Sequence, residues 1–263
     1  MNNTAKNIID IVLALVAYAA VQILVMAAFR AFLGDKLSPA LLLVLPMTVA
    51  AVLTIALFVA VKWTPVSRRY VATRPWASLA WVAVAAVGVS AASSILLDVL
   101  GLDLPEEYAR QFTVIMSHDY GYLAIGLLVP VAEEFLFRGA VLRCMLNLSG
   151  ERLHWVAIAL SAVVFGAMHG NAAQGLNAFA VGLLLGWMYW RTRSVVPGIV
   201  LHWVNNTVAY AAFVLIPGSA DKSIVDLAGG GRRAVVVLTI CALCVLIPAL
   251  YQLSMRLGKQ RVR

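Results

Sequence analysis

Charged residues are scarce in this sequence of 263 residues: Asp, Glu, Lys and Arg make up 12% of the chain, and hydrophobic residues make up 63%. Soluble domains are about one-quarter charged and about one-half apolar. The composition therefore excludes an ordinary soluble protein and predicts an integral membrane protein. Membrane topology is then the first explanation for the net charge of +8, and we expect no nucleic-acid partner.

Cysteine is also rare, and the three cysteines present are too few for a disulfide framework. Cys241 and Cys244 form a CxxC pattern inside the apolar run "VVVLTICALCVLIPAL", which favours buried helix residues over a redox or metal pair. The sequence also lacks a linker, a low-complexity tract and a convincing internal repeat. We therefore expect a single membrane domain over residues 1–263.

Long hydrophobic runs are abundant, and a membrane-spanning helix needs about 20 mostly apolar residues. Runs of this kind predict an all-α, polytopic bundle of about eight transmembrane helices. They cover residues 8–29, 39–61, 77–100, 119–142, 154–171, 173–190, 195–216 and 234–255. The longest outer loop, "GLDLPEEYARQFTVIMSHD", is acidic and could hold a helix at the membrane surface.

The distribution of Lys and Arg predicts the orientation of this bundle. With the N-terminus in the cytoplasm, 14 of the 20 basic residues lie on or towards the cytoplasmic side. Because cytoplasmic loops carry an excess of Lys and Arg, we expect both termini in the cytoplasm. The tail "MRLGKQRVR" is interpreted as an anchor that is attracted to anionic lipid of the bilayer. A compact chain with a basic inner face suggests a prokaryotic plasma membrane.

Three of the predicted helices carry polar residues, which are costly in lipid and usually serve function. These residues are Glu133, Glu134, Arg138, His169, His202, Asn205 and Asn206. Glu134 and Arg138 are four residues apart and share a helix face, which predicts an internal ion pair. Glu133 is rotated about 100° from its neighbour. It is therefore left available to take a proton from water as a general base.

The histidines and asparagines supply further catalytic groups. In "FGAMH" Phe165 and His169 are four residues apart, and in "HWVNN" His202 and Asn206 have the same spacing. An asparagine amide is a donor suited to an oxyanion, and an imidazole can donate, relay a proton or bind a metal. At about 1.5 Å per residue along straight helices, however, His169 lies at a depth of about 22 Å, against about 13 Å for Glu133. A kinked helix or shifted helix boundaries would bring these groups to one level.

The motifs "EEFLFR", "FGAMH" and "HWVNN" match, in order and spacing, the EExxxR, FxxxH and HxxxN motifs of one family. By these motifs the chain resembles the CAAX protease and bacteriocin-processing family of intramembrane proteases, also called CPBP or Abi. The resemblance covers about residues 119–210, which we expect to form the catalytic core. It implies an eight-helix intramembrane endopeptidase that cleaves a membrane-associated protein or peptide.

The resemblance also implies a role for each motif residue. Glu133 would activate water, Glu134 and Arg138 would support it, and His169 would orient water or substrate. His202 and Asn206 would stabilise the oxyanion, and Phe165 would shape the cavity. Glu133, His169 and His202 also satisfy the three-ligand pattern of a zinc metalloendopeptidase. The chain has no HExxH motif, and we favour the glutamate-dependent mechanism without metal.

Two other function classes stay open. The first is a non-catalytic immunity or partner-binding membrane protein with the same fold. The second is a transporter, because intramembrane carboxylates and histidines also form proton relays. The absence of an evident inverted repeat argues against a transporter. Gly182 and Gly186 form a GxxxG pattern, which favours close packing of a helix, and the sequence leaves the oligomeric state open.

Overall fold

The computed structural model describes residues 3–65, 67–219 and 222–258, and these ranges contain helices and no strand. The all-α prediction is confirmed. The first half of the chain forms α1 (Asn3–Leu33), α2 (Leu41–Ala60), α3 (Arg68–Ala72), α4 (Trp76–Val99) and α5 (Glu106–Met116). One continuous helical segment follows, made of η1 (Tyr122–Leu128), α6 (Val129–Glu134), η2 (Phe135–Leu142) and α7 (Arg143–Ser149). The remaining elements are α8 (His154–Ala167), α9 (Ala172–Thr192), α10 (Val196–Leu215), α11 (Ile224–Leu227) and α12 (Gly231–Arg256).

Five of these helices are long and apolar enough to cross a membrane: α1, α2, α4, α10 and α12. The structure therefore fits an integral membrane protein. The larger number of about eight membrane helices is not confirmed. Helix α8 has 14 residues, α9 carries Gln174 and Asn177, and the segment from η1 to α7 changes its helical type along its length. For these three segments, membrane crossing stays a prediction.

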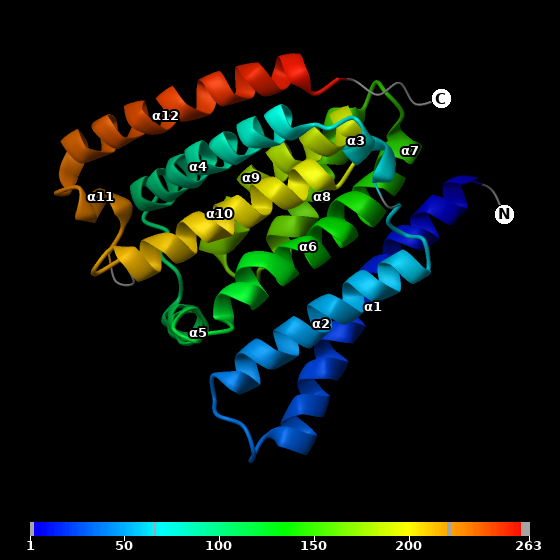
Figure 1. Cartoon of the computed structure of the whole chain (residues 1–263), viewed down its shortest axis with the longest axis horizontal. Coiled ribbons are helices and arrows are strands. Elements are labelled where there is room, and N and C mark those ends of the chain that lie inside the picture. Colours follow the sequence, from blue (N-terminus) through cyan, green and yellow to red (C-terminus); the bar gives the residue numbers. More distant parts are fainter. Residues whose placement is uncertain (1–2, 66, 220–221, 259–263) are drawn as a thin grey trace.

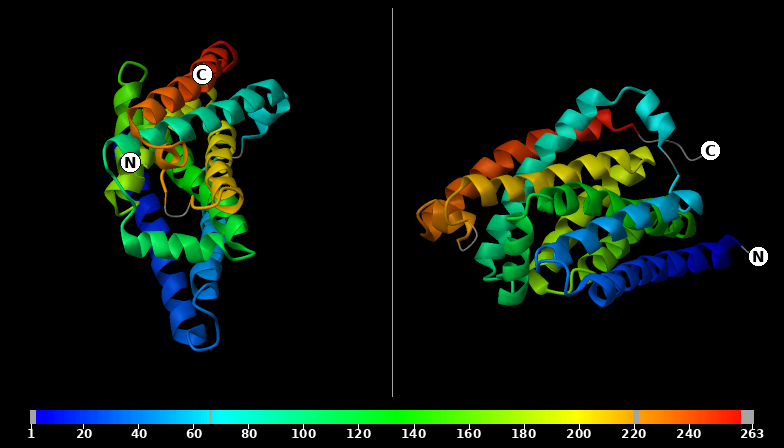
Figure 2. Two further views of the ribbon diagram at one scale, coloured as in Figure 1. Left: turned by 90° about the vertical axis from the view of Figure 1, so that its left-hand side faces the viewer. Right: turned by 60° about the horizontal axis from the view of Figure 1, so that its bottom comes forward.

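The long helices lie side by side (Figure 1). Helices α1 and α2 form a hairpin at one edge of the bundle, and α4 and α12 pack together at another (Figures 1 and 2). Helix α10 contacts α4, α9 and α6, and its buried residues, Pro197, Gly198, Leu201 and His202, lie in its first two turns. This arrangement places the helices that carry the three motifs next to one another, between the α1–α2 hairpin and the α4–α12 pair.

One end of the bundle, which we call the terminal end, holds the beginning of α1 and the last turn of α12 (Figure 1). Polar contacts connect several helices there. Arg191 donates to the carbonyl oxygen of Leu257 at 2.8 Å, and Arg143 donates to that of Trp63 at 2.9 Å. The end of α9 therefore meets the end of α12, and α7 meets the segment after α2. Residues 259–263 of the predicted lipid anchor lie outside the described residues.

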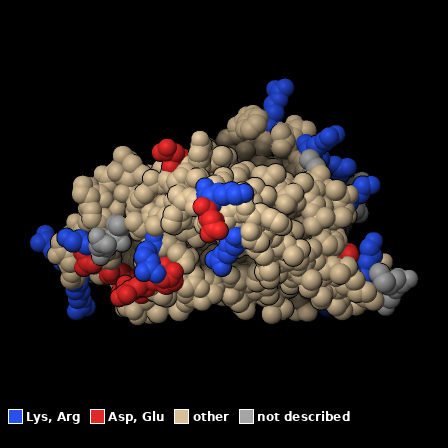
Figure 3. Space-filling view, turned by 90° about the horizontal axis from the view of Figure 1, so that it is seen from below, with Lys and Arg blue, Asp and Glu red and all other residues tan. Residues whose placement is uncertain are grey.

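Figure 3 shows broad areas without charged residues between groups of charges on one face of the molecule, and large hydrophobic side chains are exposed on many helices. Helix α1 illustrates this pattern, because Ala14 is its one fully buried residue, whereas Ile23 and Leu24 are each about two-thirds exposed. Apolar side chains on the outside are the arrangement that lipid requires. Cys241 and Cys244 lie in α12 as predicted, but they are exposed rather than buried, because they stand on a face of α12 that no other helix covers.

The segment from η1 to α7 departs from regular α-helical geometry before the EExxxR motif, in η1, and again from Phe135 within the motif, in η2. Wide π-helical turns are rare and occur mostly at functional sites. Pro130, near the start of α6, has no N–H to donate to the preceding turn. Backbone carbonyl groups that lose their hydrogen bond within the helix need donors from neighbouring helices. The motif helix is therefore held in place by contacts from its neighbours.

Small residues bring two helices of the core close together. A Cβ atom added to Gly182 or Gly186 of α9 would lie 3.1 Å from Ala162 or 2.8 Å from Ile158 of α8. The prediction that this GxxxG pattern serves helix packing is confirmed. The carbonyl oxygen of Gly182 also accepts a hydrogen bond from Arg138, so this contact reaches the motif residues.

Candidate active site

Glu134 and Arg138 form a fully buried ion pair within one helix. The Nη1 atom of Arg138 donates to Oε1 of Glu134 at 2.9 Å, and the two side chains are 1% and 0% exposed. Nη2 of Arg138 also donates to the carbonyl oxygen of Gly182 on α9 at 3.3 Å. The pair predicted from the four-residue spacing is confirmed. It ties the motif helix to α9 and neutralises one of the two carboxylates.

His202 of α10 lies between the two glutamates. Its Nδ1 atom is 3.3 Å from Oε1 of Glu134, and its Nε2 atom is 3.6 Å from Oε2 of Glu133. An ionised carboxylate can only accept, so Nδ1 of His202 carries the hydrogen in its contact with Glu134. The Glu134–Arg138 pair therefore orients the imidazole, and the imidazole presents Nε2 to Glu133.

Glu133 differs from its neighbour in environment. Its side chain is 15% exposed, and it has no arginine partner in the described part of the chain. The ring of His202 faces this carboxylate, so Glu133 has a neighbour that the sequence did not predict. The 3.6 Å separation is longer than a good hydrogen bond, so a small molecule such as water can approach both groups.

Phe165 of α8 connects the three motifs. The Cζ atom of Arg138 lies 4.5 Å from the centre of the Phe165 ring, which is a cation–π contact. The same ring meets His169 and His202 edge to face, with centroid separations of 5.0 and 5.8 Å. Phe165 therefore packs against an arginine and two imidazoles, which is more than the cavity-shaping role expected from the sequence.

His169 lies in the turn after α8, not inside a helix. The predicted helix over residues 154–171 is wrong at its end, because α8 ends at Ala167. Gly170 adopts a positive φ of 71°, and the side chain of Asn171 accepts from the N–H of Gln174 to begin α9. The chain turns at His169, whose ring packs on Phe165, so this residue lies just beyond the end of α8. The depth of His169 relative to Glu133 stays a prediction.

The amide of Asn206 binds the motif helix. Its Nδ2 atom donates to the carbonyl oxygen of Ile125 at 2.8 Å, and its Oδ1 atom accepts from Asn205 at 3.3 Å. In a π-helical turn the carbonyl of Ile125 would pair with the N–H of residue 130, which is proline and has none. Asn206 therefore satisfies a released carbonyl and keeps one amide hydrogen for another acceptor.

The part of the chain that contains the three motifs matches the model of one protein family. Residues 120–208 match the family model for Rce1-like proteins, described as type II CAAX prenyl endopeptidase Rce1-like. The family resemblance is confirmed. No curated protein and no solved structure matches the chain. The Rce1-like match spans all three motifs and supports a CAAX-protease-like endopeptidase.

The zinc alternative requires Glu133, His169 and His202 to converge on one ion. In residues 3–65, 67–219 and 222–258, no group of three or more His, Cys, Asp or Glu side chains is placed to hold a metal ion. The ring nitrogens of His202 face two carboxylates, and Nδ1 of His169 bonds the carbonyl oxygen of Phe165 at 2.9 Å. In these positions, Glu133, His169 and His202 do not fit a shared metal ion. Activity measured after chelation tests metal dependence.

Gly198 of α10 is a residue of this site that the sequence did not single out. A Cβ atom added there would collide with Oε2 of the buried Glu134, so the absent side chain leaves room for the carboxylate. The only signal in the sequence is a glycine one helical turn before His202. Such a glycine also fits ordinary helix packing, so the pattern does not distinguish the two roles.

The Gly198→Ala variant is expected to lose stability and cleavage together, because Glu134 is held by Arg138 and cannot move away freely. Overpacking of this kind costs about 1–3 kcal/mol. Thermal unfolding in detergent and a peptide cleavage assay measure the two effects. Gly258→Ala is the matched control, since no atom lies within 4 Å of an added Cβ atom there. Equal melting temperatures and rates in the two variants would contradict the close fit at Gly198.

Proposed function

We propose that this protein is an intramembrane endopeptidase that hydrolyses a peptide bond in a membrane-associated protein or peptide. The observation that carries this proposal is the position of His202 between Glu133 and the Glu134–Arg138 pair. This arrangement provides an oriented imidazole, that of His202, and a carboxylate with access to water, that of Glu133. The Rce1-like match over the same residues supports this reaction class.

In the proposed reaction, Glu133 accepts a proton from water, and the water oxygen bonds to the carbonyl carbon of the substrate. His202 and Asn206 donate hydrogen bonds to the resulting oxyanion. The C–N bond then breaks, and the proton on Glu133 passes to the leaving amine. Both ring nitrogens of His202 carry hydrogen in this step, because Nδ1 donates to Glu134 while Nε2 donates to the oxyanion.

Asn206 and His169 have secondary roles in this proposal. One amide hydrogen of Asn206 is donated to the carbonyl oxygen of Ile125. This bond fixes the orientation of the amide group, and the second amide hydrogen is donated to the oxyanion. Nδ1 of His169 donates to the carbonyl oxygen of Phe165, which leaves Nε2 as an acceptor that orients water or substrate. Phe165 keeps this imidazole and that of His202 at a set separation.

We further propose that the chain crosses the membrane about eight times with its terminal end in the cytoplasm. This end holds Lys6, Lys62, Arg68, Arg69, Arg74, Arg143, Arg152, Arg191, Arg193 and Arg256, with Asp10 and Glu151 as its acidic residues. The opposite end has Arg30, Lys36, Arg110, Lys222, Arg232 and Arg233 mixed with acidic residues that include Asp98, Glu106 and Glu107. An excess of positive charge at one end supports a cytoplasmic location for it.

Cleavage of a library of membrane-anchored peptides by the purified protein in detergent tests the reaction. Hydrolysis in ¹⁸O-labelled water is expected to place the label in the new carboxyl group of the product, as mass spectrometry can show. Repeating the reaction after chelation and after addition of zinc decides whether metal takes part. Absence of cleavage over the whole library would shift support to the non-catalytic, partner-binding function.

An apolar pocket of about 500 Å³ lies beside the motif residues. Phe135, which follows Glu134, and Ile199, which precedes His202 by three residues, line it together with Val71 of α3. Arg68 lies at the same pocket, at the terminal end of the bundle. We propose that an apolar segment of the substrate occupies this pocket while its peptide bond reaches Glu133.

The Ile199→Trp variant is expected to fill this pocket and to raise KM more than it lowers kcat. Loss of a good apolar contact in a binding pocket reduces kcat/KM by about tenfold or more. The measurement is the rate of cleavage as a function of the concentration of a membrane-anchored peptide. Ile240→Trp on α12 is the control, because Ile240 is 57% exposed on the outer surface. The same KM in both variants would rule out this pocket as part of the substrate path.

A further inference from the structure

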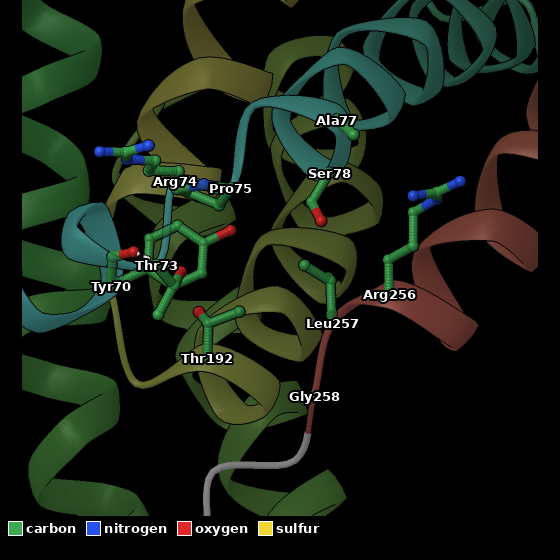
Figure 4. Close-up of a pocket in the computed structure, with 10 residues that line it drawn as sticks. All are labelled: Tyr70, Thr73, Arg74, Pro75, Ala77, Ser78, Thr192, Arg256, Leu257 and Gly258. Carbon is green, nitrogen blue, oxygen red and sulfur yellow. Dashed lines mark hydrogen bonds between the residues drawn. The ribbon is translucent and has the colours of Figure 1, made fainter.

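A second pocket, of about 390 Å³, lies at the terminal end of the bundle (Figure 4). Its walls come from α3 and the first turn of α4, from the end of α9, and from the last residues of the α12 segment. Tyr70, Arg74, Ser78, Thr192 and Arg256 supply its polar groups. The pocket shares no lining residue with the apolar pocket beside the motifs.

Tyr70 is a buried donor without a partner in this pocket. Its side chain is 8% exposed, and its hydroxyl forms no hydrogen bond in the structure. Figure 4 shows its ring across the pocket with the hydroxyl directed toward the interior of the pocket. Burial raises the pKa of Tyr70 to about 12, so the hydroxyl keeps its hydrogen at physiological pH. Buried polar groups are nearly always paired, so this hydroxyl is available to donate to an acceptor from outside the chain.

Two arginines give the pocket a positive charge. The side chains of Arg74 and Arg256 stand at opposite sides of it with their guanidinium ends turned outward (Figure 4), and no acidic residue is among the described residues that line it. Nε of Arg256 donates to Gln252 at 3.1 Å, and its terminal nitrogens make no hydrogen bond within the described chain. Both side chains are exposed and can turn toward the pocket, so an acceptor bound there is expected to be an anion with several oxygen atoms.

The wall formed by the end of α12 is held in place. Arg191 donates to the carbonyl oxygens of Ser254 and Leu257, each at 2.8 Å. These carbonyls lie in the last turn of α12 and at the residue that follows it, where a cation is favourable. Leu257 is buried at 1% exposure, so the chain leaves α12 along a fixed path beside the pocket. The pocket is thus part of the folded structure and not a gap between loose ends.

The position of the pocket relative to the membrane indicates the source of the anion. Trp76, in the first turn of α4, is 63% exposed next to the pocket, and Trp187 and Trp190 lie near the end of α9. Tryptophan is enriched at the level of the lipid headgroups. Basic pockets between membrane helices on the cytoplasmic side are suited to anionic headgroups.

We propose that this pocket binds the phosphate group of an anionic phospholipid, with Arg74 and Arg256 supplying charge and Tyr70 the buried hydrogen bond. The site is independent of the peptidase reaction, because none of these residues contacts the motif residues. A bound headgroup would connect α3, α4, α9 and α12 at the membrane surface. Anionic lipid would therefore stabilise the folded protein, whereas zwitterionic lipid would not.

The test is native mass spectrometry of the delipidated protein in detergent, titrated with phosphatidylglycerol or with phosphatidylcholine. Wild-type protein is expected to retain phosphatidylglycerol preferentially and to melt at a higher temperature in its presence. The Arg74→Gln/Arg256→Gln double variant is expected to bind this lipid at least about tenfold more weakly, because two charge-assisted contacts are lost. Tyr70→Phe keeps the ring and is expected to weaken binding about fivefold, through one lost hydrogen bond.

The control is the Arg232→Gln/Arg233→Gln variant, which removes two exposed arginines at the opposite end of the bundle. Lipid binding that falls equally in both double variants, or that is unchanged by Arg74→Gln/Arg256→Gln, would overturn the proposal. A parallel titration with inorganic phosphate separates the two sources of the anion. Stabilisation by millimolar phosphate that the lipid does not reproduce would overturn the lipid assignment and identify a site for a soluble anion.

Discussion

Replacing Glu133 by glutamine is expected to abolish peptide cleavage and to leave the fold intact. The amide has the shape of the carboxyl group, but it cannot accept a proton from water. Loss of a general base reduces catalysis by about 10²- to 10⁴-fold. Glu133 is partly exposed, and Nε2 of His202 lies 3.6 Å from its carboxylate. Little packing therefore depends on its charge, and the thermal unfolding of the variant should match that of the wild type.

The measurement is the initial rate of cleavage of one membrane-anchored peptide, together with circular dichroism and thermal unfolding in the same detergent. Glu107→Gln is the matched control, because Glu107 is an exposed glutamate on α5. It should cleave at the wild-type rate. Wild-type activity in Glu133→Gln would exclude Glu133 as the base. A Glu133→Gln variant that no longer folds would be replaced by Glu133→Asp, whose shorter carboxylate keeps the charge and should retain a reduced rate.

The local features of the site could be predicted from the sequence. The pair of Glu134 and Arg138 follows from helical periodicity alone, because residues four apart share a face. The order and spacing of the three motifs were enough to recognise the family, which the match over residues 120–208 confirms. The helical class follows from apolar runs, since lipid leaves the backbone few alternatives.

The contacts between helices could not be predicted in this way. The position of His202 between two carboxylates depends on the rotation of α10 about its axis. Because α10 has few polar residues, its apolar pattern does not determine this rotation. The bond from Asn206 to Ile125 depends on a π-helical turn, and the room for Glu134 depends on the absent side chain of Gly198. Each of these contacts can be predicted only when the residues that neighbour it in three dimensions are known.

The end of α8 shows how an error of a few residues changes an interpretation. Extending this helix through His169 placed the imidazole inside a membrane helix, at a depth of about 22 Å. The structure ends the helix at Ala167 and turns the chain at Gly170. Helix boundaries are the least reliable part of a sequence-based assignment. Here an apolar run continues to the end of the helix, and the signals for its end are a glycine with positive φ and the capping Asn171.

Replacing Arg138 by methionine is expected to be the most destabilising of these substitutions. The side chain is 1% exposed, and it bonds Glu134 and the carbonyl oxygen of Gly182 while it packs on the ring of Phe165. Methionine fills a similar volume but leaves the carboxylate of Glu134 buried without its cation. Breaking a buried ion pair by removing one partner costs about 3–5 kcal/mol.

A double-mutant cycle separates the loss of the pair from the loss of packing. Glu134→Gln alone leaves the arginine buried without its anion, whereas Glu134→Gln/Arg138→Met removes both charges. Because the desolvation cost then disappears for both groups, the double variant should be more stable than Arg138→Met alone. Unfolding in mixed micelles of increasing denaturing detergent provides the free energies. Arg30→Met, at an exposed arginine near the end of α1, should change them by less than about 0.5 kcal/mol. A stability loss in Arg138→Met no larger than in Arg30→Met would mean that the buried pair does not hold the site together. The orientation of His202 would then have to come from the packing of α10 alone.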